Sequence, residues 1–394
     1  MPGVGSLEKR GKNSWRLVVS CGRDGDKYIR KVKTIRASSA REAKRMLAEF
    51  VTEVEQGINI ESSKMTFSEF VDYWLKKYAK GNLALKTIYR YRQYLESRIV
   101  PALGQLLLQK IKPTHLLQFY ENLQEDGIRT DGKEGGLSFQ TILHHHRLIY
   151  TILSYAVEWQ MSSQNPAERA RPPKVQPKRS AVYDQEQAQT LIVALEMEAL
   201  KYRAIVMLAL STGLRQGELM GLEWQHVNYG NKTIDVQQAS QYLPGIGTFT
   251  KEPKNESSKR LVSVPPSVMH ILNELKQAQE EERTNLGDKW EESGRLFTKW
   301  NGSPMYANEM SSWFPRFLRK HALPPLPFHG LRHTSATLLI AEGTSVVDLS
   351  RRLGHSKTST TMDIYVHSLK NADTATADKM EAILKNNKPK DDDN

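Results

Sequence analysis

Four side chains that suit chemistry on a phosphate ester lie close together near the end of the sequence. His329 and Arg332 are separated by two residues, and His355 and Tyr365 follow on the same stretch. A guanidinium can grip two phosphate oxygens at once, an imidazole can donate hydrogen bonds or move a proton, and a phenol can attack as a nucleophile. Arg215 supplies a second guanidinium just after a glycine turn. These residue types predict a site that binds a phosphate and can attack it covalently.

Two short helices are predicted to position these groups. Residues 334–341 carry enough apolar side chains to bury one side of a helix, and Gly343 is predicted to end it. The segment 345–353 repeats this pattern, and Gly354 ends it. His355 would then sit just beyond a helix end, where the backbone geometry sets its position.

The order of Arg215, the pair His329-x-x-Arg332, His355 and Tyr365 resembles that of the tyrosine recombinases of the phage-integrase type. The resemblance implies that Tyr365 attacks the scissile phosphate of duplex DNA while His329 accepts its proton. It also implies that Arg215 and Arg332 hold the non-bridging oxygens, where charge builds in the transition state, and that His355 adds a hydrogen bond there.

The resemblance also implies a lysine that protonates the leaving 5′-oxygen. Strands are predicted at 233–238 and 259–264, with residues 250–260 as the end of their hairpin, where the family places this lysine. Lys254 best matches the family's Pro-Lys pattern, and Lys251 is the competing candidate. Glu218, three residues after Arg215, could orient that arginine.

Composition narrows the class of protein. The chain has 56 Lys and Arg against 44 acidic residues, a net charge of +12, which suggests a polyanionic partner. Cys21 is the only cysteine, so an intramolecular disulfide and a cysteine-based zinc site are both excluded. The run His144, His145, His146 does not predict a metal site, because adjacent residues of a helix point in divergent directions. No signal peptide or membrane span is predicted, and the expected location is the bacterial cytoplasm, at the nucleoid.

The predicted fold is multidomain and mainly α with small β-sheets. Residues 1–58 read as a hairpin followed by a helix over 40–56, a unit that resembles an arm-site DNA-binding domain of integrases. Its candidate DNA-binding residues are Arg16, Arg30, Lys31 and Lys33.

The remaining units are assigned in the same way. Residues 64–165 read as a helical core-binding domain, 166–180 as a Pro-rich basic linker, 181–370 as a mixed α+β catalytic domain, and 371–394 as a C-terminal tail. Further candidate DNA-binding residues are Arg90, Arg92, Lys174 and Lys178. The resemblance suggests that a helix in the tail docks on a neighbouring protomer.

The resemblance implies site-specific recombination, integrating or excising a mobile element or prophage through a 3′-phosphotyrosyl intermediate. It implies no metal or cofactor, a homotetramer on double-stranded DNA with core and arm sites, and accessory DNA-bending and excision-directing proteins. Two alternatives remain: DNA relaxation by a type IB topoisomerase, and a DNA-binding regulator without catalysis. The separate basic N-terminal unit favours the integrase over the topoisomerase.

Overall fold

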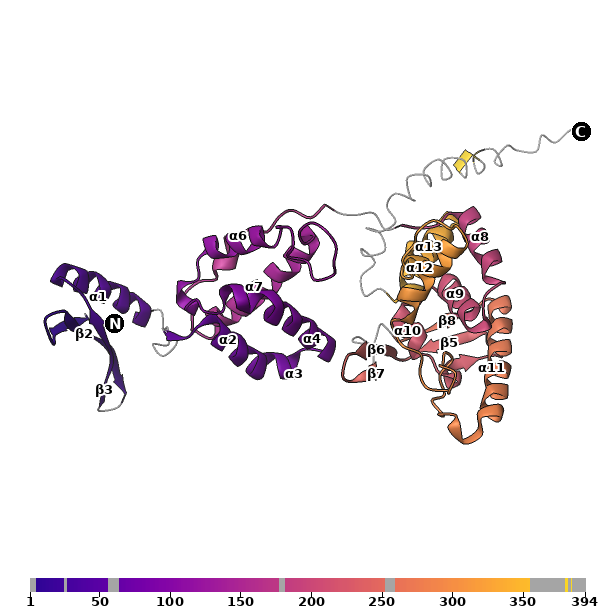
Figure 1. The fold of residues 1–394 in the computed structure, drawn as a ribbon, viewed down its shortest axis with the longest axis horizontal. Helices are drawn as coiled ribbons and strands as arrows, with labels where there is room; N and C mark the ends of the chain where they lie inside the picture. Colours follow the sequence, from indigo (N-terminus) through magenta and orange to yellow (C-terminus); the bar gives the residue numbers. More distant parts are fainter. Residues whose placement is uncertain are drawn as a thin grey trace, which may run out of the picture. The chain divides into compact units, whose positions relative to one another are not determined.

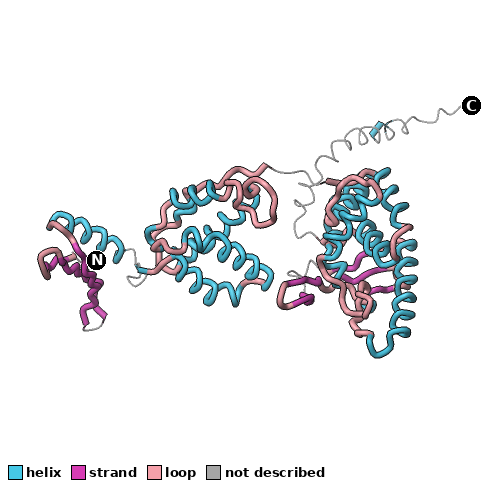
Figure 2. The backbone as a smooth tube through the Cα atoms, in the orientation of Figure 1, coloured by secondary structure: helices cyan, strands magenta, loops and turns pink. Residues whose placement is uncertain are grey.

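The computed structural model describes residues 5–24, 27–55, 64–176, 181–251 and 259–354, together with 380, 381 and 384. The chain forms two compact units, Met1–Pro177 and Lys178–Asn394, and the division falls inside the predicted linker stretch 166–180. Helices predominate and the strands form small antiparallel sheets (Figures 1 and 2), which confirms the predicted fold class. Within the described ranges, no helix combines the length and apolarity needed to cross a membrane.

The chain begins with a three-stranded antiparallel sheet covered by one helix. Strands β1 (Ser6–Lys9), β2 (Ser14–Asp24) and β3 (Lys27–Arg36) pair in that order, and α1 (Ala40–Glu55) packs over one face (Figure 1). Strand β1 was not predicted, because its four residues carry a single partly buried apolar side chain, Leu7, and no alternation shows.

The strand register decides which side chains lie under α1. Residues directly opposite each other in an antiparallel pair point to the same face of a sheet. Leu17, which is fully buried, pairs with Lys33, and Val19 pairs with Lys31. Lys31 and Lys33 therefore lie on the covered face, and the Lys33 Nζ is 5.4 Å from the centre of the Phe50 ring on α1.

A helical bundle follows. Its α-helices are α2 (Phe67–Trp74), α3 (Lys80–Asn82), α4 (Leu85–Tyr94), α5 (Val100–Leu103), α6 (Pro113–Asn122) and α7 (Phe139–Glu158). A capping box begins α2, where the Glu69 N–H donates to Thr66 Oγ1 at 3.3 Å and the Thr66 N–H donates to the Glu69 carboxylate at 2.7 Å. Ala167 and Ala170 are buried in the bundle core, so the first part of the predicted linker packs with the helices.

Pro101 does not end the helical segment that begins with α4. The chain passes from α4 through a π turn, Leu95–Ile99, directly into α5, where Pro101 occupies the first turn. In the π turn the Val100 N–H donates to the Leu95 carbonyl, five residues back. A first-turn position tolerates proline because its missing N–H is not needed there.

The three successive histidines have different environments. His145 is 1% exposed and packs between Tyr94 and Phe119, with its Nδ1 2.8 Å from the Thr141 carbonyl. His146 Nδ1 lies 2.8 Å from the Tyr120 hydroxyl. Two of the three side chains therefore take part in packing inside the bundle.

The second unit is built around one buried helix. Helix α9 (Leu200–Thr212) buries side chains on several sides and packs against α8 (Gln185–Leu195), α11 (Pro266–Leu286) and α13 (Gly330–Ala341). Helices α10 (Gln216–Gly221), α12 (Glu309–Lys320) and α14 (Val346–Leu353) complete the helical part (Figure 1). Gly354 ends α14 with φ +66°, as predicted from the sequence.

Strands β4 (Val227–Asn228), β5 (Thr233–Val236) and β8 (Arg260–Ser263) form an antiparallel sheet in that order. Between β5 and β8 the chain forms a separate hairpin of β6 (Ala239–Leu243) and β7 (Gly247–Lys251), which the sequence analysis missed. These two strands are short and largely polar, so the alternation that signals a strand is weak.

Candidate active site

A glycine turn between α9 and α10 places Arg215. Gly213 has φ +67°, and a Cβ added there would lie 2.5 Å from Leu353 Cδ2, so the position needs glycine for both conformation and space. The turn leaves Arg215 at the N-cap of α10, with its side chain 39% exposed. Arg215, the first residue of the predicted site along the chain, therefore presents a half-exposed guanidinium at the start of a helix.

Glu218 joins two guanidiniums. Its carboxylate accepts from Arg215 Nη1 at 2.7 Å and from Arg260 Nη2 at 2.8 Å, and it also accepts from the Arg215 N–H at 3.0 Å. Burial by itself raises the pKa of this carboxyl, but Arg260, and after it Arg215, hold that pKa below its usual value. Glu218 is therefore ionised at neutral pH, and it contacts both the side chain and the backbone N–H of Arg215.

The start of α13 presents the predicted His-x-x-Arg pair. His329 is the N-cap residue of α13, and Arg332, 3% exposed, lies in its first turn. Arg332 Nη1 donates to the Gly213 carbonyl and Nη2 donates to the Leu353 carbonyl, both at 2.8 Å. These two bonds connect the turn after α9 with the end of α14, so the buried arginine fixes the frame of the site.

His329 is neutral at physiological pH. Burial by its surroundings lowers its pKa, and the neighbouring His333, Arg332 and Arg215 add to the effect, to about 4. The residue is nevertheless exposed to solvent, and its ring meets that of His333 edge-on at 5.0 Å between centroids. A neutral, accessible imidazole can accept a proton.

The arginines converge on the last turn of α14. The final carbonyls of a helix have no partner within it. Here the Arg352, Leu353 and Gly354 carbonyls accept from Arg260 at 2.8 Å, from Arg332 at 2.8 Å and from Arg215 at 3.3 Å, respectively. Because these carbonyls are consecutive, the three guanidiniums gather around one helix end, with Glu218 as the carboxylate that joins two of them.

Three of the six predicted catalytic residues lie outside the described residues: Lys254, His355 and Tyr365. The competing lysine, Lys251, is the last residue of β7. The structure thus brings together Arg215, Glu218, Arg332 and His329, and the predicted roles of the others stay predictions.

Arg260 belongs to this cluster although it was not among the predicted site residues. It pairs with Val236 across the β5–β8 ladder, two residues from the buried pair Ile234 and Val262 and therefore on the same inward face of the sheet. Its side chain is 8% exposed. In the sequence, Arg260 occupies the same alternating positions as the apolar residues Val262 and Val264. This alternation was the feature that could have indicated a buried arginine.

The predicted DNA-binding residues of the N-terminal unit fall on both faces of its sheet. Arg16 pairs with Thr34, and Arg30 pairs with Ser20. These positions alternate along the strands with the buried ones, so both arginines lie on the face away from α1. Arg16 is 40% exposed and lies 3.9 Å from Glu8.

The described candidates in the bundle and linker are exposed. Arg90 and Arg92 lie on α4, with Arg90 Nε donating to the Tyr94 hydroxyl at 2.9 Å, and Lys174 lies in the extended stretch before residue 177. Lys178 lies outside the described residues.

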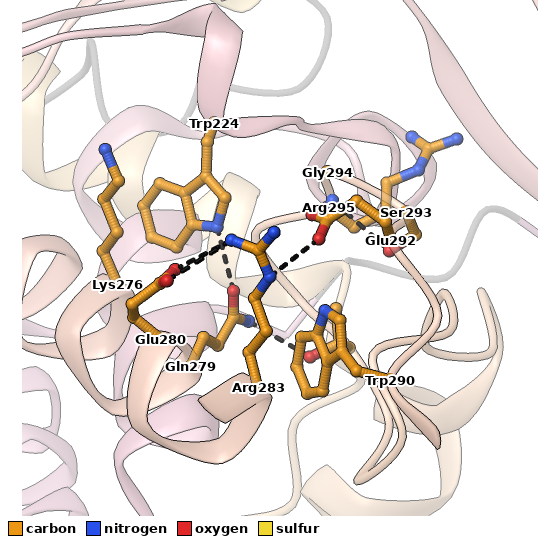
Figure 3. Close-up of a pocket in the computed structure, with 11 residues that line it drawn as sticks. Trp224, Lys276, Gln279, Glu280, Arg283, Trp290, Glu292, Ser293, Gly294 and Arg295 are labelled. Carbon is orange, nitrogen blue, oxygen red and sulfur yellow. Dashed lines mark hydrogen bonds and ion pairs between the residues drawn. The ribbon is translucent and has the colours of Figure 1, made fainter. Parts of the chain in front are cut away.

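A cavity of about 60 Å³ elsewhere in this unit is lined by none of the predicted catalytic residues (Figure 3). Gln279 accepts from Trp224 Nε1 at 2.9 Å and donates to the Leu296 carbonyl at 2.7 Å, and Arg283 pairs with Glu292 at 3.0 Å. These polar groups bond to one another and hold α11 against the segment that follows it. We therefore assign the lining of this cavity a structural role.

Two family models match the sequence. Residues 181–372 match the phage integrase family, and residues 66–124 match the N-terminal SAM-like domain of phage integrases. The chain belongs to the phage integrase family of tyrosine recombinases. Members of this family break and rejoin DNA strands at specific sites, which is the activity that the motif order implied.

This recombinase has curated relatives of similar length. A tyrosine recombinase XerC-like protein of Caldanaerobacter subterraneus subsp. tengcongensis is 27% identical over 378 residues, covering 91% of this chain and 93% of the relative. The ICEBs1 integrase of Bacillus subtilis is 27% identical over 277 residues, covering 70% and 72%.

Solved structures share the fold. The Tn1549 transposon integrase in complex with a circular intermediate DNA matches with a TM-score of 0.66 at 20% identity, covering 80% of this chain and 99% of that chain. A lambda integrase tetramer bound to a Holliday junction matches with a TM-score of 0.54 at 17% identity, covering 89% and 96%.

Proposed function

We propose that this recombinase cleaves duplex DNA by transesterification, with Tyr365 as the nucleophile. The phenolic oxygen attacks the scissile phosphorus, the bond from phosphorus to the 5′-oxygen breaks, and a 3′-phosphotyrosyl link and a free 5′-hydroxyl result. The phenol proton passes to His329, and Lys254 protonates the leaving 5′-oxygen. Because the link preserves a phosphodiester, a second 5′-hydroxyl can reverse the step without an external energy source.

The observation that carries this proposal is the cluster at the end of α14. Arg215 and Arg332 come from different helices, and their guanidiniums bond to the neighbouring carbonyls of Leu353 and Gly354. Fixed cations aimed at one place stabilise the charge that builds on the non-bridging oxygens of a five-coordinate phosphorus. Arg215, 39% exposed, is the more accessible of the two to a DNA phosphate.

His329 has the protonation state that its role needs. With a pKa of about 4 it is unprotonated at pH 7, so it can take the phenol proton as the P–O bond forms. An imidazole charged at that pH could only donate.

The proposal is tested by trapping the covalent intermediate. A duplex that spans a junction of the mobile element carrying this gene, with a nick beside the scissile phosphate, lets the cleaved fragment diffuse away so that the adduct accumulates. The wild type should form a protein–DNA adduct, and Tyr365→Phe should bind the duplex but form none. A wild type that binds without adduct would indicate the regulator, and relaxation of supercoiled plasmid without strand exchange would indicate the topoisomerase.

The choice between Lys254 and Lys251 is tested with sulfur in place of the bridging 5′-oxygen. A thiolate leaves without protonation, so the variant of the true general acid regains cleavage on this substrate. We expect Lys254→Ala to be rescued, and rescue of Lys251→Ala in its place would exchange the assignment.

We also infer how this recombinase assembles. Strand exchange needs two duplexes cut in turn, which calls for a homotetramer on DNA at core and arm sites in the bacterial cytoplasm, aided by accessory DNA-bending and excision-directing proteins. The tail 371–394 is proposed to join protomers. Cooperative assembly on DNA that survives deletion after Lys370 would reject that role.

A further inference from the structure

Arg260 connects two parts of the site without facing the solvent. Its Nη2 donates to Glu218 at 2.8 Å and its Nε donates to the Arg352 carbonyl at 2.8 Å, while the side chain is only 8% exposed. The fit is close, because a Cβ added to Gly354 would lie 2.8 Å from Arg260 Nη1. One buried guanidinium therefore touches both the partner of Arg215 and the end of α14.

The three links to the end of α14 differ in how readily they can be released. Arg215 makes the longest, 3.3 Å to the Gly354 carbonyl, and it is the most exposed of the three arginines. A guanidinium that grips a phosphate uses a pair of its N–H groups. Since Arg215 Nη1 is held by Glu218 at 2.7 Å, the Nη2 that now bonds to Gly354 is the group that a phosphate would take. Arg260 Nε bonds to a different carbonyl, that of Arg352, so this link does not have to break when Arg215 leaves Gly354.

We propose that Arg260 is a positioning residue for the cleavage reaction: it holds Glu218, and through it Arg215, and it anchors the end of α14 when Arg215 turns to the scissile phosphate. The inference rests on the proposed function. Gly354 is the last described residue before His355, so the anchor also fixes the point from which the segment carrying His355 and Tyr365 starts.

The same contacts would exist if Arg260 only stabilised the fold, and the two roles predict different substrate dependence. A merely structural arginine would lower cleavage of every substrate equally. An arginine that acts through Arg215 matters in proportion to the negative charge on the phosphate. Replacing one non-bridging oxygen by methyl removes that charge while leaving the bond to be broken.

The experiment measures single-turnover cleavage and DNA affinity for the full chain, with the native phosphate and with a methylphosphonate at the scissile position. Arg260→Ala should slow cleavage of the phosphate by about 10-fold to 100-fold, with DNA affinity little changed. The deficit should largely disappear on the methylphosphonate. Arg260→Lys keeps the charge but can reach only one of the two acceptors, so it should show a smaller deficit with the same dependence on substrate.

Arg351→Ala is the matched control, because Arg351 also lies in the last turn of α14 but is 80% exposed. It should cleave both substrates like the wild type. Equal deficits on the two substrates in the Arg260 variants, or wild-type cleavage of the phosphate by both of them, would overturn the inference. A wild type that forms no adduct would instead remove the proposed function, and the inference with it.

Discussion

The strand register of the N-terminal sheet places two pairs of basic side chains on opposite faces, which allows the DNA-binding face to be tested. Arg16 and Arg30 lie on the open face, whereas Lys31 and Lys33 lie on the face under α1. We predict that the Arg16→Gln, Arg30→Gln variant weakens DNA binding much more than Lys31→Gln, Lys33→Gln. Both variants remove two positive charges, so long-range attraction to DNA falls equally and the difference reports direct contact.

The expected difference in DNA affinity follows from counterion release. If each open-face arginine neutralises one phosphate, losing both lowers the slope of log affinity against log salt by about 1.8. Between 50 and 200 mM salt the wild type should then lose about tenfold more affinity than the arginine variant. Glu8 competes for Arg16 at 3.9 Å, so Glu8→Gln should bind slightly more tightly.

The assay is fluorescence anisotropy of the full chain on a labelled duplex from an end of the element, titrated at several salt concentrations. Far-ultraviolet circular dichroism checks that both variants keep their fold. If the lysine variant lowers the slope as much as the arginine variant, the assignment of the open face as the DNA-binding face is refuted.

Three further predictions concern the frame of the site and the bundle. Glu218→Gln leaves the nearly buried Arg260 without its carboxylate. Native-state hydrogen exchange over residues 204–222 should therefore show a loss of about 3 kcal/mol in opening free energy. An unchanged opening free energy would contradict a buried ion pair. Because the pKa of Glu218 is lowered in the fold, the wild type should also lose this stabilisation as the pH falls below about 4.3, through the folded pKa, whereas the variant should not. Gly213→Ala should reduce both thermal stability and cleavage more than Gly245→Ala, since both glycines have positive φ but an added Cβ meets nothing within 4 Å at Gly245; equal effects would show that conformation alone matters. Burial lowers the pKa of His145, so this imidazole takes up a proton more readily in the unfolded chain than in the fold. Urea denaturation should therefore show the bundle losing stability as the pH falls below about 6.5. If a His145→Leu variant loses as much stability over the same pH range, another group is responsible.

Local signals in the sequence were enough to predict the helices of the site. Ser345 accepts from the Asp348 N–H at 3.1 Å and caps α14, and Gly354 ends that helix in the left-handed conformation, as the residue types indicate. The pair His329 and Arg332 lies at the start of α13 because the apolar stripe that follows it must pack inward. These features depend on residues within one or two helical turns.

Features that depend on distant pairing were not predictable in the same way. The hairpin β6–β7 interrupts the pairing of β5 with β8, and nothing local in its polar strands reveals that insertion. Arg260 is buried only because Glu218 and the Arg352 carbonyl approach it from elsewhere in the fold. The two faces of the N-terminal sheet likewise depend on a register that composition does not show, so four basic residues looked equivalent in the sequence.

The account depends on one chemical event, the esterification of Tyr365 to DNA beside fixed guanidiniums. The most direct measurement is mass spectrometry of the trapped adduct after digestion with protease and nuclease, which identifies the modified residue and the end of DNA attached to it. The account predicts a 3′-phosphate on Tyr365. A nucleotide on any other residue, or a 5′-phosphate link, would contradict it.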